Sequence, residues 1–463
     1  MASRKLTLSI IAGVSASLIT FCSLYQPEIS LLTIALAVYS WISYKRPFTG
    51  LMLLLLLPVL GEFSRLNILG RSLVLSDIII PLFEISALIG INNFKFSKSV
   101  TRQLQIIGIF ILIAIFSLLF SLTTLSINDV FQSSLYLIRL IVYLGLLPIS
   151  YLIIKKTTTS KAITYVTISI LLIAGTGLVQ LIYLPTLEDL AKSSGYDPHI
   201  NRLVGSWLDP NFIGGLFAII IVFLTSLSLY EKSSRKKTFY IISSLICTVA
   251  LFFTYSRSAY LALAGGVLIL GLIKAKKLLV IFLIISSIGI ASSERAQQRL
   301  SELTTSVKSV IFNTSENPDP TARLRIQNWE QTINLISQKP LLGHGYNTLS
   351  IVKLSSGYIQ NTGIHSASGS DSSILTIIAT TGILGLIPFL IFLLNILLHS
   401  FANWKNSKDQ HSKAISLGTF CSIIVLLIHC NFVNSLFFPQ IMIYIWVLLG
   451  IFYRHKKEPK IDQ

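Results

Sequence analysis

Apolar runs of about 17–25 residues recur along most of the chain, separated by short polar gaps. A helix needs this length to cross the hydrocarbon core of a bilayer. A spanning segment must also satisfy its own backbone hydrogen bonds, and the alternating pattern of membrane β-barrels is absent. The sequence therefore predicts an all-α integral membrane protein, with residues 1–463 forming a single polytopic domain. The composition agrees, because only 12% of the residues are charged, about half the usual share of a soluble domain.

We expect about 12–14 transmembrane helices. Two of the candidate segments, 48–60 and 277–291, are short for a span. The segment at 6–25 follows a basic N-terminus, but no clear signal-peptide cleavage site comes after it, so we interpret it as the first helix. The candidates lie at 6–25, 28–44, 48–60, 73–91, 103–122, 132–154, 161–184, 210–230, 238–254, 258–273, 277–291, 372–398, 413–433 and 435–453.

The distribution of charge predicts the orientation. With both termini cytoplasmic and the helices alternating, the cytoplasmic segments hold 24 of the 37 basic residues but four of the 19 acidic ones. This is the positive-inside pattern of multi-pass membrane proteins. The net charge of +18 thus follows from topology, and a nucleic-acid partner is not needed to explain it.

The segment 292–371 is the one long stretch without an apolar run that could span a bilayer. The predicted orientation makes it an extracytoplasmic loop. A polar loop of this length suggests chemistry at the outer membrane face rather than passage through the membrane. Its residues with chemical potential are Arg323, Arg325, His344, His365 and Asp371.

Two parts of this loop have a local pattern. Ile326, Trp329, Ile333 and Ile336 recur at helical spacing, which predicts a short interfacial helix that holds Arg323 and Arg325 at headgroup level. A glycine-rich turn follows over 340–347, and such turns can present backbone amides to anions, although this signal alone is weak.

Two shorter outer elements carry arginines. Arg202 precedes Asp209-Pro210-Asn211, whose residue types also suit a simple helix cap. Arg257 lies between two apolar helices with almost no loop between them. A buried arginine is costly in a membrane, so Arg257 either has a partner or a function, or extends its side chain to the headgroups.

Three further residues have both an ordinary and a functional interpretation. Asp371 could cap the helix that follows it or act as a base, and His365 could be an ordinary loop histidine. Arg139 lies well inside a predicted helix. It could form a structural ion pair with Asp77, or both residues could face a polar cavity that opens outward.

These elements, in this order, resemble the O-antigen ligase and O-antigen polymerase family of bacterial membrane glycosyltransferases. The resemblance runs from about Arg202 to Gly450. It rests on four short motifs that gain specificity from their order: the arginine, glycine and Pro-Asn positions of 202–211, Ser-Arg at 256–257, Arg-x-x-x-Trp to Pro-Leu-Leu-Gly-x-Gly at 325–345, and Gly-Ile-Leu-Gly at 382–385.

The resemblance implies metal-independent glycosyl transfer at the outer face of the bacterial cytoplasmic membrane, without a cofactor. The donor would be a glycan on undecaprenyl diphosphate, the acceptor a glycan or a lipid-linked glycan, and membrane lipids would surround both. Arginine forks pair well with diphosphate oxygens. Arg202, Arg257 and Arg325 match family arginines, with Arg323 in reserve and Arg139 as a further candidate for substrate binding.

The sequence departs from the family at the expected base. The family often has His-Asn about eleven residues before the glycine that corresponds to Gly382, where this chain has Asp371 and Ser372. Asp371 or His365 would then accept the proton of the acceptor hydroxyl. This departure favours a polymerase over a lipid A–core ligase, and the patterns leave both open.

A lipid-linked oligosaccharide flippase, or another polysaccharide transporter, is the alternative of a different class. Such proteins also have twelve to fourteen helices and basic cavities. The long outer loop argues against this alternative, because alternating-access transporters generally have balanced halves. The four cysteines show neither metal-ligand spacing nor a disulfide framework, and no metal site is expected.

Overall fold

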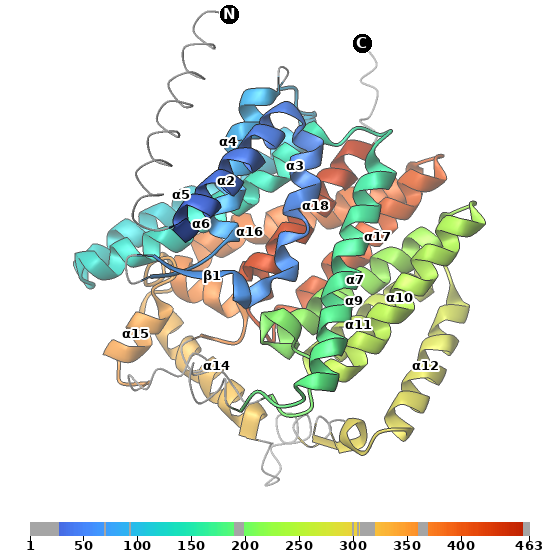
Figure 1. Cartoon of the computed structure of the whole chain (residues 1–463). Helices are drawn as coiled ribbons and strands as arrows, with labels where there is room; N and C mark the ends of the chain where they lie inside the picture. Colours follow the sequence, from blue (N-terminus) through green and yellow to red (C-terminus); the bar gives the residue numbers. More distant parts are fainter. Residues whose placement is uncertain are drawn as a thin grey trace, which may run out of the picture.

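The computed structural model describes residues 27–68, 71–91, 94–188, 199–298, 301–302, 305, 320–359 and 369–456. Most of these residues are helical (Figure 1), and the strands among them are one antiparallel hairpin, β1 (Arg65–Ile68) and β2 (Arg71–Val74). Because the helices are long and apolar, the prediction of an all-α membrane protein is confirmed.

The bundle helices agree closely with the predicted segments. They are α2 (Pro27–Lys45), α3 (Pro47–Leu54), α4 (Ser76–Gly90), α5 (Lys98–Phe120), α6 (Ile127–Ile153), α7 (Thr159–Tyr183), α9 (Pro210–Tyr230), α10 (Ser234–Thr254), α11 (Arg257–Ile273), α12 (Lys276–Ala291), α16 (Ser373–Asn406), α17 (Gln410–His429) and α18 (Pro439–His455). Helices α14 (Pro320–Gln338) and α15 (Leu349–Ser355) lie in the long loop. Short 3₁₀ turns are η1 (Leu57–Val59), η2 (Gly61–Ser64), η3 (Ser121–Thr123), η4 (Gly205–Trp207) and η6 (Ser435–Phe437).

The number of spanning helices differs from the prediction. Seven helices of the described residues are long and apolar enough to cross a membrane, namely α5 with η3, α6, α7, α9, α10, α16 and α17. Helices such as α3, α4, α11, α12 and α18 are shorter than the roughly 20 residues that a straight span needs. The apolar pattern located these helices; it overestimated the length of α3, α4 and α18, but not of α11 and α12. The predicted segment 6–25 lies outside the described residues.

Helix α9 is the centre of the fold. Its residues from Ile213 to Leu224 are all buried, and α10, α11 and α17 pack around it. Two adjacent glycines permit this approach, because a Cβ on Gly215 would lie 2.5 Å from the ring of His429 in α17. A helix that is apolar on every face is expected at such a buried position.

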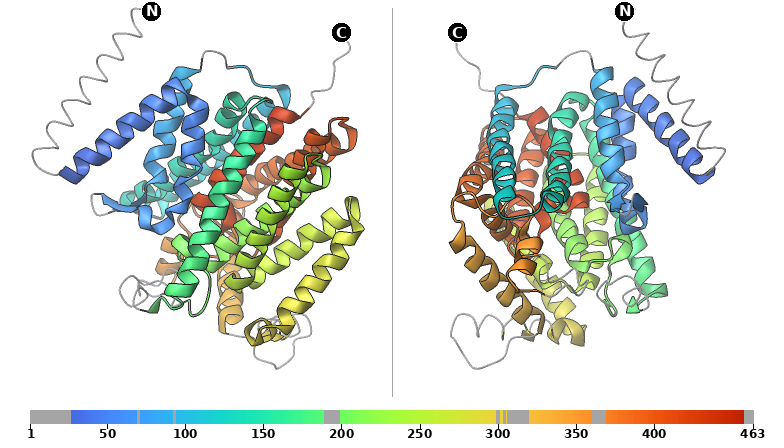
Figure 2. Two further views of the ribbon diagram at one scale, coloured as in Figure 1. Left: turned by 45° about the vertical axis from the view of Figure 1, so that its right-hand side comes forward. Right: turned by 90° about the vertical axis from the view of Figure 1, so that its left-hand side faces the viewer.

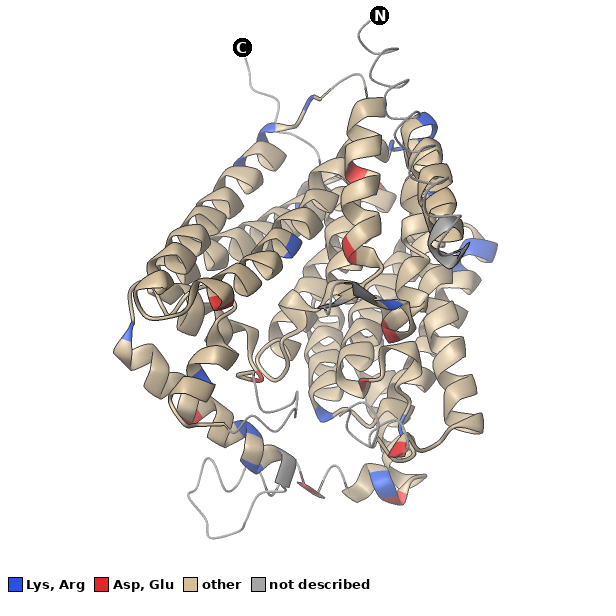
Figure 3. Ribbon diagram, turned by 60° about the vertical axis from the view of Figure 1, so that its left-hand side comes forward, with Lys and Arg blue, Asp and Glu red and all other residues tan. Residues whose placement is uncertain are grey.

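The two ends of the bundle differ. We call the end where α9, α11 and α16 begin the loop end. Figure 2 shows α14 and α15 at this end, whereas α5 begins at the opposite end. Figure 3 shows long uncharged stretches of helix between most of the charged residues. The loop end is therefore the place where charged side chains of the long loop meet the bundle.

Helix α16 is broken where the glycine-rich turn meets it. Gly382 has φ 65° and ψ −171°, so the helix is interrupted in its first half. The turn fills the interruption with backbone hydrogen bonds: His344 N to Ala379 O is 2.9 Å, Gly345 N to Thr380 O is 3.0 Å, and Ile383 N to Pro340 O is 2.9 Å. Ser117 of α5 adds a bond of 2.6 Å to the carbonyl of Leu342. The freed carbonyl and amide groups of α16 are thus satisfied inside the protein.

Glycine is required on both sides of this junction. A Cβ on Gly382 would lie 2.0 Å from the carbonyl oxygen of Leu341, and a Cβ on Gly343 would lie 2.5 Å from the backbone of Thr380. Both residues also have positive φ, which disfavours other L-residues. The two glycine motifs, which stand apart in the sequence, are therefore two halves of one contact.

Candidate functional site

The segment before α9 connects to the turn between α10 and α11. Asp209 Oδ1 accepts hydrogen bonds from the amides of Asn211 (2.7 Å) and Phe212 (3.2 Å), so Asp209 is the N-cap of α9. Its burial raises the pKa of its carboxyl group. The side chain of Asn211 instead accepts a bond of 2.9 Å from Ser256 Oγ. The simple capping interpretation therefore holds for Asp209, whereas Asn211 links the segment before α9 to the turn between α10 and α11.

Three arginines gather at the turn between α10 and α11, where Tyr255 has a left-handed conformation with φ 48°. Arg202 donates from Nε to the carbonyl of Thr254 at 2.8 Å. Arg257 is the first residue of α11 and forms an ion pair of 3.5 Å with Glu302. The guanidinium of Arg295 lies over the ring of Tyr255, 5.0 Å from its centroid. The structure thus brings Arg202 and Arg257 together and adds Arg295, which the sequence analysis did not single out.

Helix α14 places its two arginines in different surroundings. Arg323 is exposed, whereas Arg325 is partly buried and lies near enough to the buried ring of His429 to interact with it electrostatically. His429 bonds Ser435 Oγ at 2.5 Å through Nδ1 and lies 3.4 Å from Ser258 Oγ through Nε2. Ser258 of α11 and Arg325 of α14 therefore approach the same histidine from two helices.

Helix α14 buries a largely polar face against the protein. Asn328, Thr332 and Leu335 are buried, whereas Ile333, which was expected on one apolar face with Ile326 and Trp329, is 53% exposed. Helix α14 packs against α16, and Asn328 bonds Asp371 just before that helix. The helices predicted inside the loop are confirmed, and the expectation that the apolar face of α14 lies along the membrane surface stays a prediction.

Asp371 belongs to a network of three side chains from three segments. Its Oδ2 accepts a hydrogen bond of 2.9 Å from Asn328 Nδ2 of α14. The side chain of Ser372, and not that of Asp371, caps α16, since it accepts from Leu375 N. Asp371 itself has φ 54°, an uncommon value for a residue other than glycine. The alternative that Asp371 is merely a helix cap is therefore wrong.

Lys353 of α15 completes the network. It is fully buried and donates to Gly369 O at 2.7 Å and to Asn328 Oδ1 at 3.4 Å. Burial lowers the pKa of its ammonium group to about 8, and the nearby charge of Asp371 opposes this shift. Lys353 thus bonds the side chain that holds the Asp371 carboxylate and the backbone two residues before Asp371. These two bonds fix the position of the carboxylate. No motif pointed to Lys353, because exposed and buried lysines look alike in a sequence.

The family model described as O-antigen ligase matches residues 242–390, about a third of the chain. This match supports membership of the O-antigen ligase family. It confirms the resemblance found in the motifs. The matched segment contains Arg257, Arg325, Asp371 and the glycine junction of α16. A search of curated proteins found no match.

The O-antigen ligase match includes the glycine-rich turn, but this turn does not present its amides to a ligand. The amides of Gly343, His344 and Gly345 all bond carbonyl groups of the protein. His344 Nε2 lies 2.8 Å from Leu335 O, and burial lowers the pKa of this histidine. The suggestion of an anion site in this turn is therefore wrong, and the turn is a structural part of the matched region.

Arg139 lies outside the matched region and has both predicted properties. It forms an ion pair of 2.5 Å with Asp77, as the structural interpretation expected. It also lines a cavity of about 230 Å³ at the loop end. The structural ion pair is therefore confirmed, and Arg139, but not Asp77, lines the cavity, because one guanidinium has enough donors for both roles.

Two further residues complete the account of the expected site. His365 lies outside the described residues. Among the described residues, no group of three or more histidine, cysteine, aspartate or glutamate side chains is arranged to hold a metal ion. The sequence did not indicate His429, whose one signal was its position at the end of an apolar helix.

Proposed function

We propose that this protein transfers or polymerises glycan carried on undecaprenyl diphosphate, at the outer face of the bacterial cytoplasmic membrane. The product would be O-antigen or a related envelope polysaccharide, and we favour a polymerase over a ligase. One observation carries the proposal: the region that matches the O-antigen ligase family holds Arg257, Arg325 and Asp371, and all three lie at the loop end. In this proposal the whole chain acts as one membrane domain, with both termini cytoplasmic and the loop 292–371 outside.

The arginines suit the leaving group. When the acceptor oxygen attacks the anomeric carbon, the bond between that carbon and the diphosphate oxygen breaks, and its electron pair passes to the diphosphate. Arg257 and Arg325 would stabilise this charge through planar, bidentate hydrogen bonds, so that no metal is required. Arg323 is exposed nearby on α14 and would assist in binding.

Arg202 suits a supporting role in the same site. Its guanidinium already bonds the backbone carbonyls of Thr254 and Tyr255, directly before Ser256 and Arg257. It would hold the turn between α10 and α11 and add positive charge near the diphosphate. Arg295, which lies over Tyr255, would add to the same field.

Asp371 suits the general base. Its carboxylate is held by Asn328, and Lys353 fixes the backbone of Gly369 two residues earlier. The proton of the acceptor hydroxyl would pass to Asp371 as the new glycosidic bond forms. His365 is the alternative base, which substitution of each residue separately would distinguish.

A glycan ladder from cells tests this proposal. Cells that lack the protein would be complemented with wild type, Arg257→Ala, Asp371→Ala or His365→Ala at matched protein levels. A polymerase predicts long chains with wild type and single lipid-linked repeats with the variants of the true site. Long chains that accumulate on the lipid carrier would indicate a ligase. Normal ladders from Arg257→Ala and Asp371→Ala would contradict the proposed site.

A further inference from the structure

The cavity beside Arg139 lies between the bundle and the long loop. Its volume is about 230 Å³, and its walls come from α6, α9, α16, α18 and the residues before α15. Pockets for drug-sized ligands usually measure about 300–1,000 Å³, so this cavity suits a single sugar ring. Besides two tyrosines, the polar residues that line it are Arg139, Asn347, Thr376, Thr380 and Asn434.

Aromatic side chains form the rest of its wall. Phe212 and Phe438 stack with centroids 3.8 Å apart and an angle of 9° between their rings. Tyr136 and Tyr346 also line the cavity, and Tyr136 lies 5.0 Å from the guanidinium of Arg139. Flat aromatic surfaces beside amide and hydroxyl groups suit a sugar, which has apolar C–H faces and a rim of hydroxyl groups.

The charge of the cavity favours an uncharged sugar. Asp77 neutralises Arg139, and it also accepts a hydrogen bond of 3.0 Å from Tyr143. A diphosphate in this cavity would contact one arginine, Arg139, whose charge Asp77 already compensates. Arg257 and Arg325 do not line this cavity. Arg139 keeps further N–H donors for hydroxyl oxygens.

The cavity is connected to the segment that carries the proposed base. Thr376 Oγ1 donates to Asn434 Oδ1 at 3.0 Å, and it lies 2.7 Å from Ser370 Oγ. Ser370 directly precedes Asp371. Hydrogen bonds thus connect the cavity, through Thr376 and Ser370, to the residue that directly precedes the proposed base, which suits the position of an acceptor rather than of a departing diphosphate.

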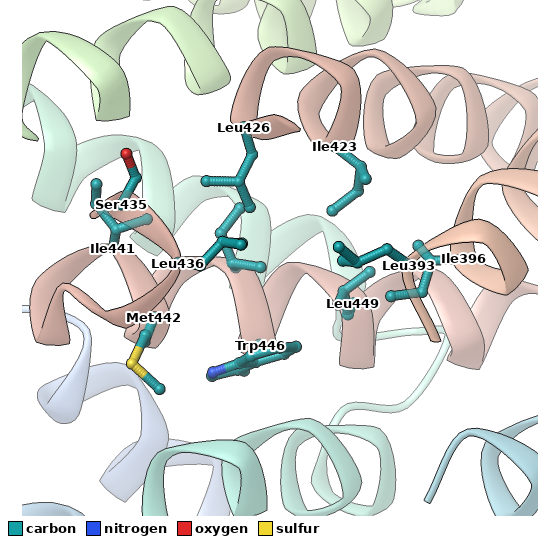
Figure 4. A pocket seen from close by; sticks show the side chains of 11 residues that line it. Leu393, Ile396, Ile423, Leu426, Ser435, Leu436, Ile441, Met442, Trp446 and Leu449 are labelled. Atoms are coloured by element: carbon teal, nitrogen blue, oxygen red, sulfur yellow. The ribbon is translucent and has the colours of Figure 1, made fainter. Parts of the chain in front are cut away.

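The neighbouring cavity lacks this chemistry. Figure 4 shows a second cavity, in which Leu436, Met442 and Trp446 contribute to an almost wholly apolar lining. The two cavities share Met442. The polar groups thus end where the apolar lining begins, so that recognition of a sugar is confined to the cavity beside Arg139.

We propose that the cavity beside Arg139 binds one uncharged sugar ring of the acceptor glycan. This inference rests on the proposed transferase function and names the part of the site that selects the acceptor. The residues that would contact the sugar are Tyr136, Arg139, Asn347 and Asn434.

Binding of a free glycan tests the inference. The probe is the repeat-unit oligosaccharide released by mild acid from the lipid carrier of cells that lack the protein. Its affinity for the purified full chain in nanodiscs would be compared among wild type, Tyr136→Ala and Asn434→Leu. Tyr136 is 48% exposed, so its substitution leaves the helix packing intact. We expect each variant to bind about tenfold more weakly, as the loss of about 1.4 kcal/mol implies.

The control is Asn431→Leu. Asn431 is an exposed residue of the same type outside the cavity, so this variant should bind the free glycan like wild type. Wild-type affinity in both cavity variants, or no binding by wild type, would overturn the inference.

Transfer activity on the intact lipid-linked repeat unit, measured in parallel, separates the two proposals. Absence of any new glycosidic bond with wild type would refute the proposed function. Normal transfer by the cavity variants, with an unchanged KM for the acceptor, would refute the cavity assignment alone.

Discussion

The long loop meets the bundle in two places that are built differently. The glycine-rich turn joins α16 through backbone amides and carbonyls, and it has no room for a Cβ at Gly343 or Gly382. The Asp371 network, in contrast, is made of side chains from α14, α15 and the segment before α16. The first contact fixes the position of the loop, and the second places charged groups at the surface of the bundle.

The two contacts, although both lie in the matched region, therefore have different roles: the glycine-rich turn is structural, and the Asp371 network carries side chains that can act on a substrate. A contact that uses only backbone atoms tolerates no added volume but carries no charge that could act on a substrate. A network of side chains can lose one member and keep the fold. Substitutions at the glycine-rich turn should therefore impair folding, whereas substitutions in the Asp371 network should impair activity.

Gly382→Ala should have the largest effect. Its Cβ would lie 2.0 Å from Leu341 O at a positive φ, so we expect destabilisation of about 3 kcal/mol or more and little folded protein in the membrane. The measurement is the yield and thermal stability of the purified protein. Gly108→Ala is the matched control, because a Cβ there meets no atom within 4 Å. Equal yields from both variants would contradict the role of the junction.

Arg325→Gln should fold normally and lose about 100-fold in transfer rate, as is typical when a group that stabilises developing charge is removed. The measurement is the initial rate with the lipid-linked repeat unit. Arg235→Gln, an exposed residue of α10 far from the long loop, is the control. A rate within threefold of wild type would remove Arg325 from the site.

Lys353→Met should change the dependence of stability on pH. The lysine has a pKa of about 8 in the folded protein and 10.5 as its ordinary value, so between these values the unfolded chain binds more protons. The free energy of unfolding of wild type therefore rises with pH in this window relative to Lys353→Met. Thermal melts at about pH 7.5 and 9.5 measure the change, with the exposed Lys232→Met as control. Parallel melting shifts in wild type and Lys353→Met would show that burial does not lower the pKa of this lysine.

Arg323→Gln should have the smallest effect, a loss of about threefold or less. The side chain is exposed, where charge interactions are weak and screened by salt. The measurement is the transfer rate at low and high ionic strength, and the difference from wild type should shrink as salt rises. A loss as large as that of Arg325→Gln would place Arg323 in the diphosphate site.

The sequence predicted most of the helices because a long apolar run in a membrane can satisfy its backbone hydrogen bonds in few structures other than a helix. It predicted some boundaries less well: α11 begins within one residue of the predicted segment, whereas α4 and α18 begin three and four residues later than predicted. It could not predict which side of α14 is buried. Asn328 and Thr332 are polar, and only their contacts within the fold show that they face inward.

The candidate site was predicted only in part, because the sequence shows residue types but not which side chains are buried together. Arginines in the connections between apolar segments are conspicuous in such a chain, so the sequence alone indicated Arg202, Arg257 and Arg325. It did not indicate Lys353 and His429, because their significance comes from burial next to Asp371 and Arg325. The junction at Gly382 was visible as a motif, but its partner in the loop is about 40 residues away in the sequence.

Reconstituted transfer is the most direct test of the central claim that the loop end forms glycosidic bonds. Purified protein in liposomes would receive the lipid-linked repeat unit that accumulates in cells lacking it. The account predicts longer lipid-linked chains and released undecaprenyl diphosphate with wild type, and neither product with Arg325→Gln or Asp371→Asn. Movement of the repeat unit across the bilayer without any new bond would contradict it and indicate a flippase.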